Sequence, residues 1–293
     1  MDNALVIANG KGGVLKTTVV AHVAGLAAVA GWRVLAVDLD PQGNLARDLG
    51  YVDRSDGGRS LFDAVRRGLP LEPLLNVRDR LDVVAAGDET ADLALVLGAG
   101  TQSAGESAFD RLGEVLTPLG SNYDLVVIDT PPANPVLVRA ALRFCRWVVI
   151  PTLPDSASID GMGRVWADLR AATAVNPDVE VLGVALTLLQ AGATAVARDA
   201  RAELDEILMG KVPVFTTTIR IAQSVARACR ERGILANEYE QDALRSEPWY
   251  KAHREGRKHE RYSAAAGSLA AEYQSLVDEI LAAVSTSLAS GTT

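Results

Sequence analysis

The sequence predicts an α/β protein built as a three-layer sandwich, with helices on both faces of a mostly parallel, twisted sheet. Short apolar runs alternate with longer helical segments, a pattern typical of βαβ units joined by right-handed crossovers. The first apolar run leads into a glycine-rich stretch and then a helix, the order found where phosphate binds at a helix N-terminus. We expect one domain over residues 1–293.

The composition supports a large buried core. The chain has 293 residues, of which 48% are hydrophobic, and its net charge is −8. This charge is uneven, because residues 191–262 carry 13 basic and 11 acidic side chains whereas the remainder is acidic. If a polyanion binds this protein, we expect it on that late segment.

The cysteines and the apolar runs predict a cytoplasmic protein that does not use a membrane. Cys145 and Cys229 are isolated and form no C-x-x-C pair. The first apolar run is interrupted by Asn9 and Gly10, unlike the core of a signal peptide. No uninterrupted apolar run reaches the roughly 18 residues needed to span a bilayer.

The glycine-rich stretch, residues 10–18, predicts a phosphate-binding loop. Backbone N–H groups must converge on a phosphate, and glycines let the chain wrap closely around it. Lys16 would reach the β- and γ-phosphates, and the Thr17 hydroxyl would be a ligand of Mg²⁺. The residues that we expect to bind the nucleotide here are Gly12, Gly13, Val14, Leu15, Lys16, Thr17 and Thr18.

One position departs from the phosphate-loop pattern G-x-x-x-x-G-K-[ST], because Leu15 stands where the second glycine belongs. A glycine there normally serves a backbone conformation that costs a residue with a Cβ roughly 1–3 kcal/mol. Two outcomes follow from the sequence. Either the loop tolerates the strain, or the handling of the nucleotide is altered.

The next elements bring carboxylates to the same edge of the sheet. We expect a helix over 17–30 and a strand over 33–37, which delivers Asp38 and Asp40 at its carboxyl end, where open α/β sheets bind ligands. The alternative for Asp40 is that it caps a turn with Pro41. The continuous apolar run 123–129 predicts a buried parallel strand that ends at Asp129, opposite the loop and suited to supporting Mg²⁺.

The segments between and after these strands complete the expected order. We predict a surface connection over 53–80 with a short helix at 60–67, a strand over 81–87, and helices over 89–97 and 106–119 separated by a Gly/Ser/Ala loop. Further on, we expect strands over 147–151 and 179–188, a helix over 158–174 between them, a helix over 194–209, and two short strands over 212–215 and 218–220.

The last third contains two basic clusters. Arg227 and Arg230 lie three residues apart on one predicted helix face, close to Arg220, and either bind a polyanion or pair with Glu231 and Glu238. Cations and aromatic residues alternate over 249–262, within a possible helical insertion at 248–266 that would bind phosphate or lie exposed. The final helix, 268–288, lacks lysine and arginine, so we expect it to pack on the sheet and not on a membrane.

Three ordered motifs resemble those of the ParA/MinD group of P-loop ATPases. The loop with its extra lysine, Lys11, resembles that group's deviant Walker A box. The stretch 37–44, Val-Asp-Leu-Asp-Pro-Gln-Gly-Asn, resembles its second box, and 126–132, Val-Val-Ile-Asp-Thr-Pro-Pro, resembles its Walker B segment. The resemblance extends to about residue 283 and implies a P-loop NTPase fold with ATP and Mg²⁺ as cofactors.

The resemblance also implies roles for individual residues. Lys11 and Lys16 would act on the phosphates as catalytic residues, Lys11 reaching the nucleotide of a partner subunit, and Asp40 would orient the attacking water. Thr17, Asp38 and Asp129 would serve the metal. Pro213 would lie beside the adenine, and the DNA-binding residues would be Arg220, Arg227 and Arg230.

The function implied is an ATPase that forms a homodimer on binding ATP, binds nonspecific DNA as a dimer, and is stimulated by a partner protein. Such a protein would be cytoplasmic and nucleoid-associated and would drive plasmid or chromosome partition, or position another cargo. No helix-turn-helix domain precedes the loop, so we expect the short form of the family, without operator-specific autoregulation.

Two alternatives stay open at this point. In the first, Leu15 impairs hydrolysis, and the chain is a nucleotide-binding scaffold instead of an enzyme. In the second, the chain is another member of the ParA/MinD group, such as a metal-cluster carrier or a kinase regulator in polysaccharide export. The absence of paired cluster cysteines and of a tyrosine-rich tail counts against those two branches.

Overall fold

The computed structural model describes residues 1–104, 107–132, 134–246, 254 and 262–290. Within these ranges, eight strands form one sheet in the order β3-β4-β2-β5-β1-β6-β7-β8. The strands are β1 Ala4–Ile7, β2 Val34–Asp38, β3 Leu74–Arg78, β4 Leu81–Val84, β5 Leu125–Asp129, β6 Trp147–Thr152, β7 Glu180–Leu189 and β8 Val214–Arg220.

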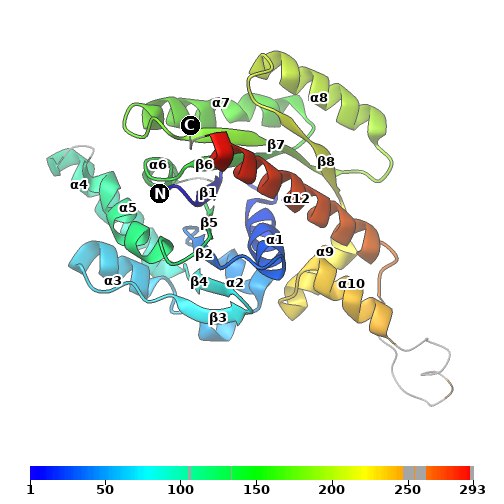
Figure 1. Cartoon of the computed structure of the whole chain (residues 1–293), viewed down its shortest axis with the longest axis horizontal. Helices are drawn as coiled ribbons and strands as arrows, with labels where there is room; N and C mark the ends of the chain where they lie inside the picture. The colour runs from blue at the N-terminus through cyan, green and yellow to red at the C-terminus, as the bar shows by residue number, and fades with distance from the viewer. Residues whose placement is uncertain (105–106, 133, 247–253, 255–261, 291–293) are drawn as a thin grey trace.

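Helices connect the parallel strands and cover both faces of the sheet (Figure 1). They are α1 Lys16–Val29, α2 Asn44–Leu49, the 3₁₀ turn η1 Val52–Arg54, α3 Arg59–Arg67, α4 Asp88–Ala104, α5 Ser107–Gly120, α6 Pro135–Leu142, α7 Ser156–Thr173, α8 Thr194–Leu208, α9 Gln223–Arg232, α10 Ala236–Arg245 and α12 Ala266–Ser290.

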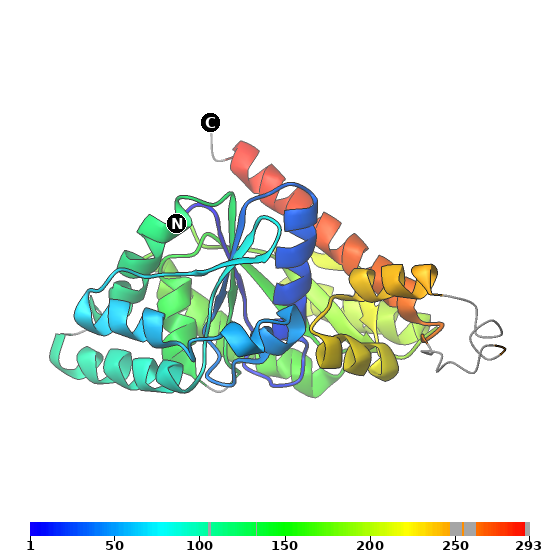
Figure 2. The same cartoon turned by 90° about the horizontal axis from the view of Figure 1, so that it is seen from below.

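The predicted three-layer α/β sandwich is confirmed. All strand pairs are parallel except β3 with β4, and successive residues of a strand face opposite layers, as in a sheet buried on both sides. In β1, Leu5 and Ile7 belong to the core cluster under α1 and α12, whereas Ala4 and Val6 belong to the cluster under α5, α6 and α7. Figure 2 shows α1 and α12 on one side of the sheet and α4 and α5 on the other.

The C-terminal helix packs on the sheet, as the sequence predicted. The indole Nε1 of Trp147 on β6 donates a hydrogen bond of 3.0 Å to Ser287. Glu279 accepts hydrogen bonds from the backbone N–H groups of Thr216 and Thr217, at 2.6 and 2.8 Å. The acidic character of α12 is thus used to hold the backbone of the edge strand β8.

Three local predictions were wrong. Residues 74–78 form the antiparallel edge strand β3. This strand has no clear pattern in the sequence, because it is only half-buried and is irregular at Asn76, where φ is 52°. The expected Gly/Ser/Ala loop after 97 is helical, because α4 continues to Ala104 in spite of the low helix propensity of Gly98 and Gly100. Residues 214–220 form one continuous strand, β8, which spans the gap between the runs 212–215 and 218–220.

The predicted helical insertion at 248–266 falls almost entirely on residues 247–253 and 255–261, outside the described ranges. The basic-aromatic segment 249–262 therefore stays a prediction. Tyr262 lies within the described ranges, and the guanidinium carbon of Arg232 lies over its ring, 5.0 Å from the ring centroid.

Candidate functional site

The glycine-rich loop joins the carboxyl end of β1 to the amino end of α1. Because β1 is a central strand between β5 and β6, the loop lies at the edge where the parallel strands end. Gly13 has a φ of 73° and an open surrounding, with no heavy atom within 4 Å of the place a Cβ would take. A Cβ on Gly12 would meet only the Pro132 ring, at 3.8 Å. The loop backbone is therefore accessible to a ligand.

Leu15 occupies the position just before α1 in a left-handed backbone conformation, with φ 65° and ψ 24°. The expectation that position 15 needs a conformation penalised by a Cβ is confirmed. The Val19 N–H still donates to the Leu15 carbonyl at 2.8 Å, so the helix begins normally. The loop thus holds a leucine in the conformation that a glycine adopts without strain.

Two buried carboxylates face the loop. Asp38 ends β2 and Asp129 ends β5, and the two residues are direct partners in the sheet register. Both are fully buried. One oxygen of Asp38 accepts the Asp40 N–H at 2.8 Å, but its Oδ2 and both oxygens of Asp129 have no hydrogen-bond partner in the part of the chain that the structure describes. Buried carboxylate oxygens without partners are costly, so this pair fits a cation.

Burial also raises the pKa values of this pair of carboxyl groups. Burial raises the pKa of the Asp129 carboxyl to about 7, against the opposing effects of the Thr17 hydroxyl and the Lys16 ammonium. Burial, and then the charge of Asp129, also raise the pKa of Asp38 well above its ordinary value. A cation bound beside both carboxylates would therefore favour their ionised forms.

The donor set suits Mg²⁺, a hard cation that takes oxygen ligands. Mg²⁺ is usually held by one or two carboxylates together with substrate phosphates, and the Thr17 hydroxyl lies beside Asp129. Among the described residues there is no group of three or more His, Cys, Asp or Glu arranged to hold a metal alone. The residues present therefore fit a metal that shares its ligands with a bound phosphate.

Asp40 lies beside this pair and is only 7% exposed. Its Oδ1 accepts the Gln42 N–H at 3.0 Å, so the turn-capping alternative describes part of what it does. Lys16 is buried next to Asp40 and Asp129, and its ammonium donates to the Lys11 carbonyl at 2.9 Å. Burial lowers the pKa of Lys16, whereas the charges of Asp129 and Asp40 raise it.

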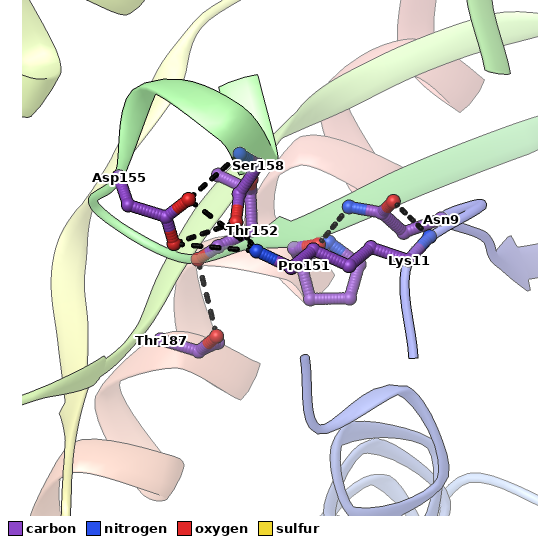
Figure 3. A network of polar contacts seen from close by, with 7 residues as sticks. All are labelled: Asn9, Lys11, Pro151, Thr152, Asp155, Ser158 and Thr187. Atoms are coloured by element: carbon purple, nitrogen blue, oxygen red, sulfur yellow. Dashed lines mark hydrogen bonds and ion pairs between the residues drawn. The ribbon is translucent and has the colours of Figure 1, made fainter. Parts of the chain in front are cut away.

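Lys11 contacts other residues of the same chain (Figure 3). Its ammonium lies 3.3 Å from Asp155 Oδ1 and also contacts the Ser158 hydroxyl. Asp155 caps α7, because its Oδ1 accepts the Ser158 N–H at 2.8 Å. The Lys11 N–H donates to Asn9, whose amide donates to the Pro151 carbonyl at 2.7 Å. The start of the loop is therefore tied to β6 and to the N-terminus of α7.

A cavity of about 400 Å³ opens beside the end of the loop. Leu15 and Thr18 line its loop side, Leu188 lines it from β7, and the residues that follow β8 close it, together with α9 and α12. No pattern in the sequence predicts this cavity, because its walls come from distant segments. A second cavity, of about 340 Å³, lies at the loop's start and includes Gly10, Pro132 and Arg164.

Pro213 does not lie with the other predicted nucleotide-binding residues, and this prediction needs correction. Pro213 precedes β8, and its carbonyl accepts the Val184 N–H at 2.9 Å within the sheet. In a parallel strand the amino end points away from the edge that holds the loop. The opposite end of β8, at Arg220, is the one that lines the cavity beside Leu15.

The three predicted DNA-binding arginines come together around this cavity, but each has an acidic partner. Arg227 Nε lies 2.7 Å from Glu231, as the alternative interpretation expected, and its side chain is 81% exposed. Arg220 pairs with Glu272 at 2.6 Å, and Arg230 pairs with Asp48 at 2.9 Å. Of the three, Arg227 is the most accessible.

Asp48, which the sequence analysis did not single out, joins the loop to α9. Its Oδ2 accepts the Thr18 hydroxyl at 3.0 Å, and its Oδ1 accepts Arg230 Nε at 2.9 Å. The helices α2 and α9 also meet at their ends, where a Cβ on Gly50 would lie 2.6 Å from the Gly233 carbonyl oxygen. Arg78 pairs with Glu238 nearby, at 2.8 Å.

Within the ranges that the structure describes, no helix has both the length and the apolar character needed to cross a bilayer.

Comparison with known proteins agrees with the motifs. Residues 3–181 match the AAA domain family. The chromosome-partitioning ATPase Soj of Thermus thermophilus is 35% identical over 223 residues, which cover 75% of this chain and 83% of that protein. Soj of Bacillus subtilis, named a sporulation initiation inhibitor protein, is 32% identical over 65% of this chain and 74% of its own.

Solved structures share the fold. An ATP complex of McdA from Cyanothece has a TM-score of 0.71 at 20% identity and covers 88% of this chain and 98% of its own. The septum site-determining protein MinD of Pyrococcus horikoshii, complexed with Mg-ADP, has a TM-score of 0.67 at 21% identity and covers 95% of both chains. The ordered motifs, the parallel sheet and the relatives agree, and the chain belongs to the ParA/MinD family of P-loop ATPases.

Proposed function

We propose that this protein binds ATP with Mg²⁺ on the glycine-rich loop and hydrolyses it as a slow, partner-stimulated switch. The observation that carries the proposal is the pair Asp38 and Asp129, whose buried oxygens lack partners beside the loop. Buried carboxylate oxygens without partners are unfavourable until a cation binds them, and Mg²⁺ bound together with the phosphates of ATP would be that cation. The Mg-ADP and ATP complexes of MinD and McdA are in keeping with this ligand.

Each residue of the site would then have a defined role. Lys16 leaves the Lys11 carbonyl to hold the β- and γ-phosphates, and the loop N–H groups hold the rest of the chain of phosphates. Thr17, Asp38 and Asp129 would hold the metal, which when bound neutralises phosphate charge. Asp40, at the end of the same turn as Asp38, orients the attacking water.

We place the base in the cavity of about 400 Å³ at the end of the loop. Its size is within the range of small-molecule sites, and its lining includes Leu15 and Thr18, which flank the proposed phosphate and metal contacts Lys16 and Thr17. This assignment replaces the one made for Pro213.

The switch would consist of an ATP-dependent homodimer. Lys11 starts the loop and is partly exposed, with a side-chain accessibility of 35%. In the subunit alone it contacts Asp155, and we propose that it exchanges this contact for the phosphates of a partner's nucleotide. Hydrolysis would remove the charge that holds the two subunits together.

The dimer would bind nonspecific DNA through the arginines around the cavity and associate with the nucleoid. Arg227 is the leading candidate because it is exposed and its pair with Glu231 contributes little. Arg220 and Arg230 would first have to leave Glu272 and Asp48. Binding of this kind weakens steeply with salt. The names of the Soj relatives favour chromosome or plasmid partition, with a partner protein that stimulates hydrolysis, over another positioning role.

One set of experiments tests this function. We expect the purified protein to hydrolyse ATP, to dimerise in ATP with Mg²⁺, and to retain DNA at low salt, and we expect Lys16→Ala to abolish all three. Arg227→Ala should reduce DNA retention alone, and the matched control is Arg198→Ala, an arginine of α8 with 77% exposure. A protein that stays monomeric in saturating ATP, even with Leu15→Gly, would contradict the proposal.

The second candidate is a nucleotide-binding scaffold with impaired hydrolysis, and the observation that favours it is the strained Leu15. Measured with and without DNA, the rates of ATP hydrolysis of the native protein and of Leu15→Gly separate the two. Equal and substantial rates would exclude the scaffold, whereas a large gain in the glycine variant would support it.

A further inference from the structure

Two leucines in left-handed backbone conformations line the same cavity. Leu15 has a φ of 65° and Leu188 a φ of 58°, and both belong to the wall of the 400 Å³ cavity. Among the described residues, the others with positive φ that are not glycine are Asn76, Arg80 and Met209, none of which lines that cavity. A conformation that disfavours leucine therefore occurs twice at one site.

The two leucines are held by neighbours that touch each other. Thr187, directly before Leu188, is fully buried, and its hydroxyl lies 3.3 Å from the Val14 carbonyl oxygen and 3.1 Å from that of Thr152. Val14, directly before Leu15, is fully buried as well. The loop and the end of β7 are thereby fixed against each other, and each leucine extends from one of the two fixed segments.

Glycine would adopt both backbone conformations without strain, so the backbone alone does not explain leucine at these positions. What leucine adds is apolar surface. The charged groups around the cavity are engaged with one another, because Arg220 pairs with Glu272 while Arg230 and Thr18 both contact Asp48. The lining also contains apolar side chains, among them Ile221, Ala222 and Ala226, together with His22 and Gln223.

We infer that Leu15 and Leu188 form an apolar clamp on the nucleoside part of the nucleotide, so that Leu15 sets affinity for the nucleoside instead of disabling the phosphate loop. This inference rests on the proposed placement of the base. In this chain, the Leu15 side chain would add contacts to the base and sugar. The phosphates are bound by groups that the Leu15 side chain does not alter.

The test compares two ligands by calorimetry in the presence of Mg²⁺: ATP, and inorganic tripolyphosphate, which has no nucleoside. Leu15→Ala and Leu188→Ala remove the apolar side chain, and Leu15→Gly also relieves the backbone. We expect all three variants to bind ATP on the order of tenfold more weakly than the native protein. We expect their affinity for tripolyphosphate to change less than about twofold.

The outcomes that would overturn the inference are distinct. If Leu15→Gly binds both ligands more tightly, Leu15 acts through backbone strain and the clamp is wrong. If the variants lose affinity for both ligands equally, the side chain supports the loop and not the nucleoside. A native protein that binds neither ligand would instead refute the proposed function itself.

Two controls keep these results interpretable. Met209→Gly relieves a left-handed residue at the end of α8, 72% exposed and outside the cavity, so it measures the effect of strain relief on thermal stability. It should leave both affinities unchanged. Leu188→Ala lies outside the phosphate loop, so it tests the clamp even if changes at Leu15 unfold the loop.

Discussion

The carboxylate pair yields a quantitative prediction, which is that Asp129→Asn stabilises the metal-free protein at high pH. Burial raises the pKa of Asp129 from 3.8 to about 7. The folded state therefore keeps its proton over a range in which the unfolded chain has lost it. The free energy of unfolding falls as the pH rises from about 4 to about 7 and stays low above that range.

The size of the effect follows from the shift. The difference of about 3 pH units, at 1.36 kcal/mol for each, corresponds to about 4 kcal/mol. An asparagine has nearly the same shape and never carries the charge, so it removes this loss. As the pH rises from 4 to 8, we expect the free energy of unfolding of Asp129→Asn to increase by about 4 kcal/mol relative to that of the native protein. An increase of any size in this direction agrees with the reasoning.

The assay is urea unfolding of both proteins in EDTA, from pH 4 to pH 8. The quantity of interest is the difference between the two free energies of unfolding, because contributions from groups that do not interact with Asp129 cancel. One of these is His22, whose pKa burial lowers to about 4 and which therefore destabilises the fold as the pH falls below 6.5. A difference that stays constant over the whole pH range would refute the reasoning. Adding Mg²⁺ and ATP in excess of the EDTA should raise the free energy of unfolding of the native protein at pH 8.

Three further predictions concern contacts of the site and its surroundings. Asp155→Asn keeps the cap on α7 but weakens the hold on Lys11. So exposed a pair contributes less than about 1 kcal/mol, and a symmetric dimer would break it twice, so sedimentation in ATP should show the dimer Kd falling by up to about 30-fold. An unchanged or higher Kd would contradict this. Gly233→Ala should destabilise the fold by about 2–4 kcal/mol in thermal melts, because a Cβ there would lie 2.3 Å from the Gly50 Cα and φ is 66°. Gly210→Ala, with φ 64° and open space, is its control and should cost about 1 kcal/mol. Finally, Ser287→Ala leaves the buried Trp147 N–H without its partner, so chemical unfolding should show a loss of about 1–3 kcal/mol, and a neutral result would mean that water replaces the hydroxyl.

The elements that the sequence predicted correctly are those with a local signature. The strands ending at Asp38 and Asp129 are continuous apolar runs, and the order of strands and helices follows from their alternation. The left-handed conformation at Leu15 could be predicted because the loop pattern requires a glycine there. These features depend on neighbours in the chain.

The elements that the sequence could not predict depend on contacts between distant residues. The edge strand β3 exists because β4 offers it hydrogen bonds, not because 74–78 has a strand pattern. The partners of Lys11, Arg220 and Arg230 are between 52 and 182 residues away in the chain. The cavity has walls from five separate segments, so no residue spacing in the sequence predicts it.

The close approach of Gly50 and Gly233 has a mechanical consequence. Helix α2 follows the turn that carries Asp40, and helix α9 carries Arg227 and Arg230, yet their ends touch main chain to main chain with no side chain between them. A displacement that carried α2 toward α9 would bring backbone directly against backbone. The helix that follows the Asp40 turn and the helix that carries Arg227 and Arg230 therefore have little room to approach each other further.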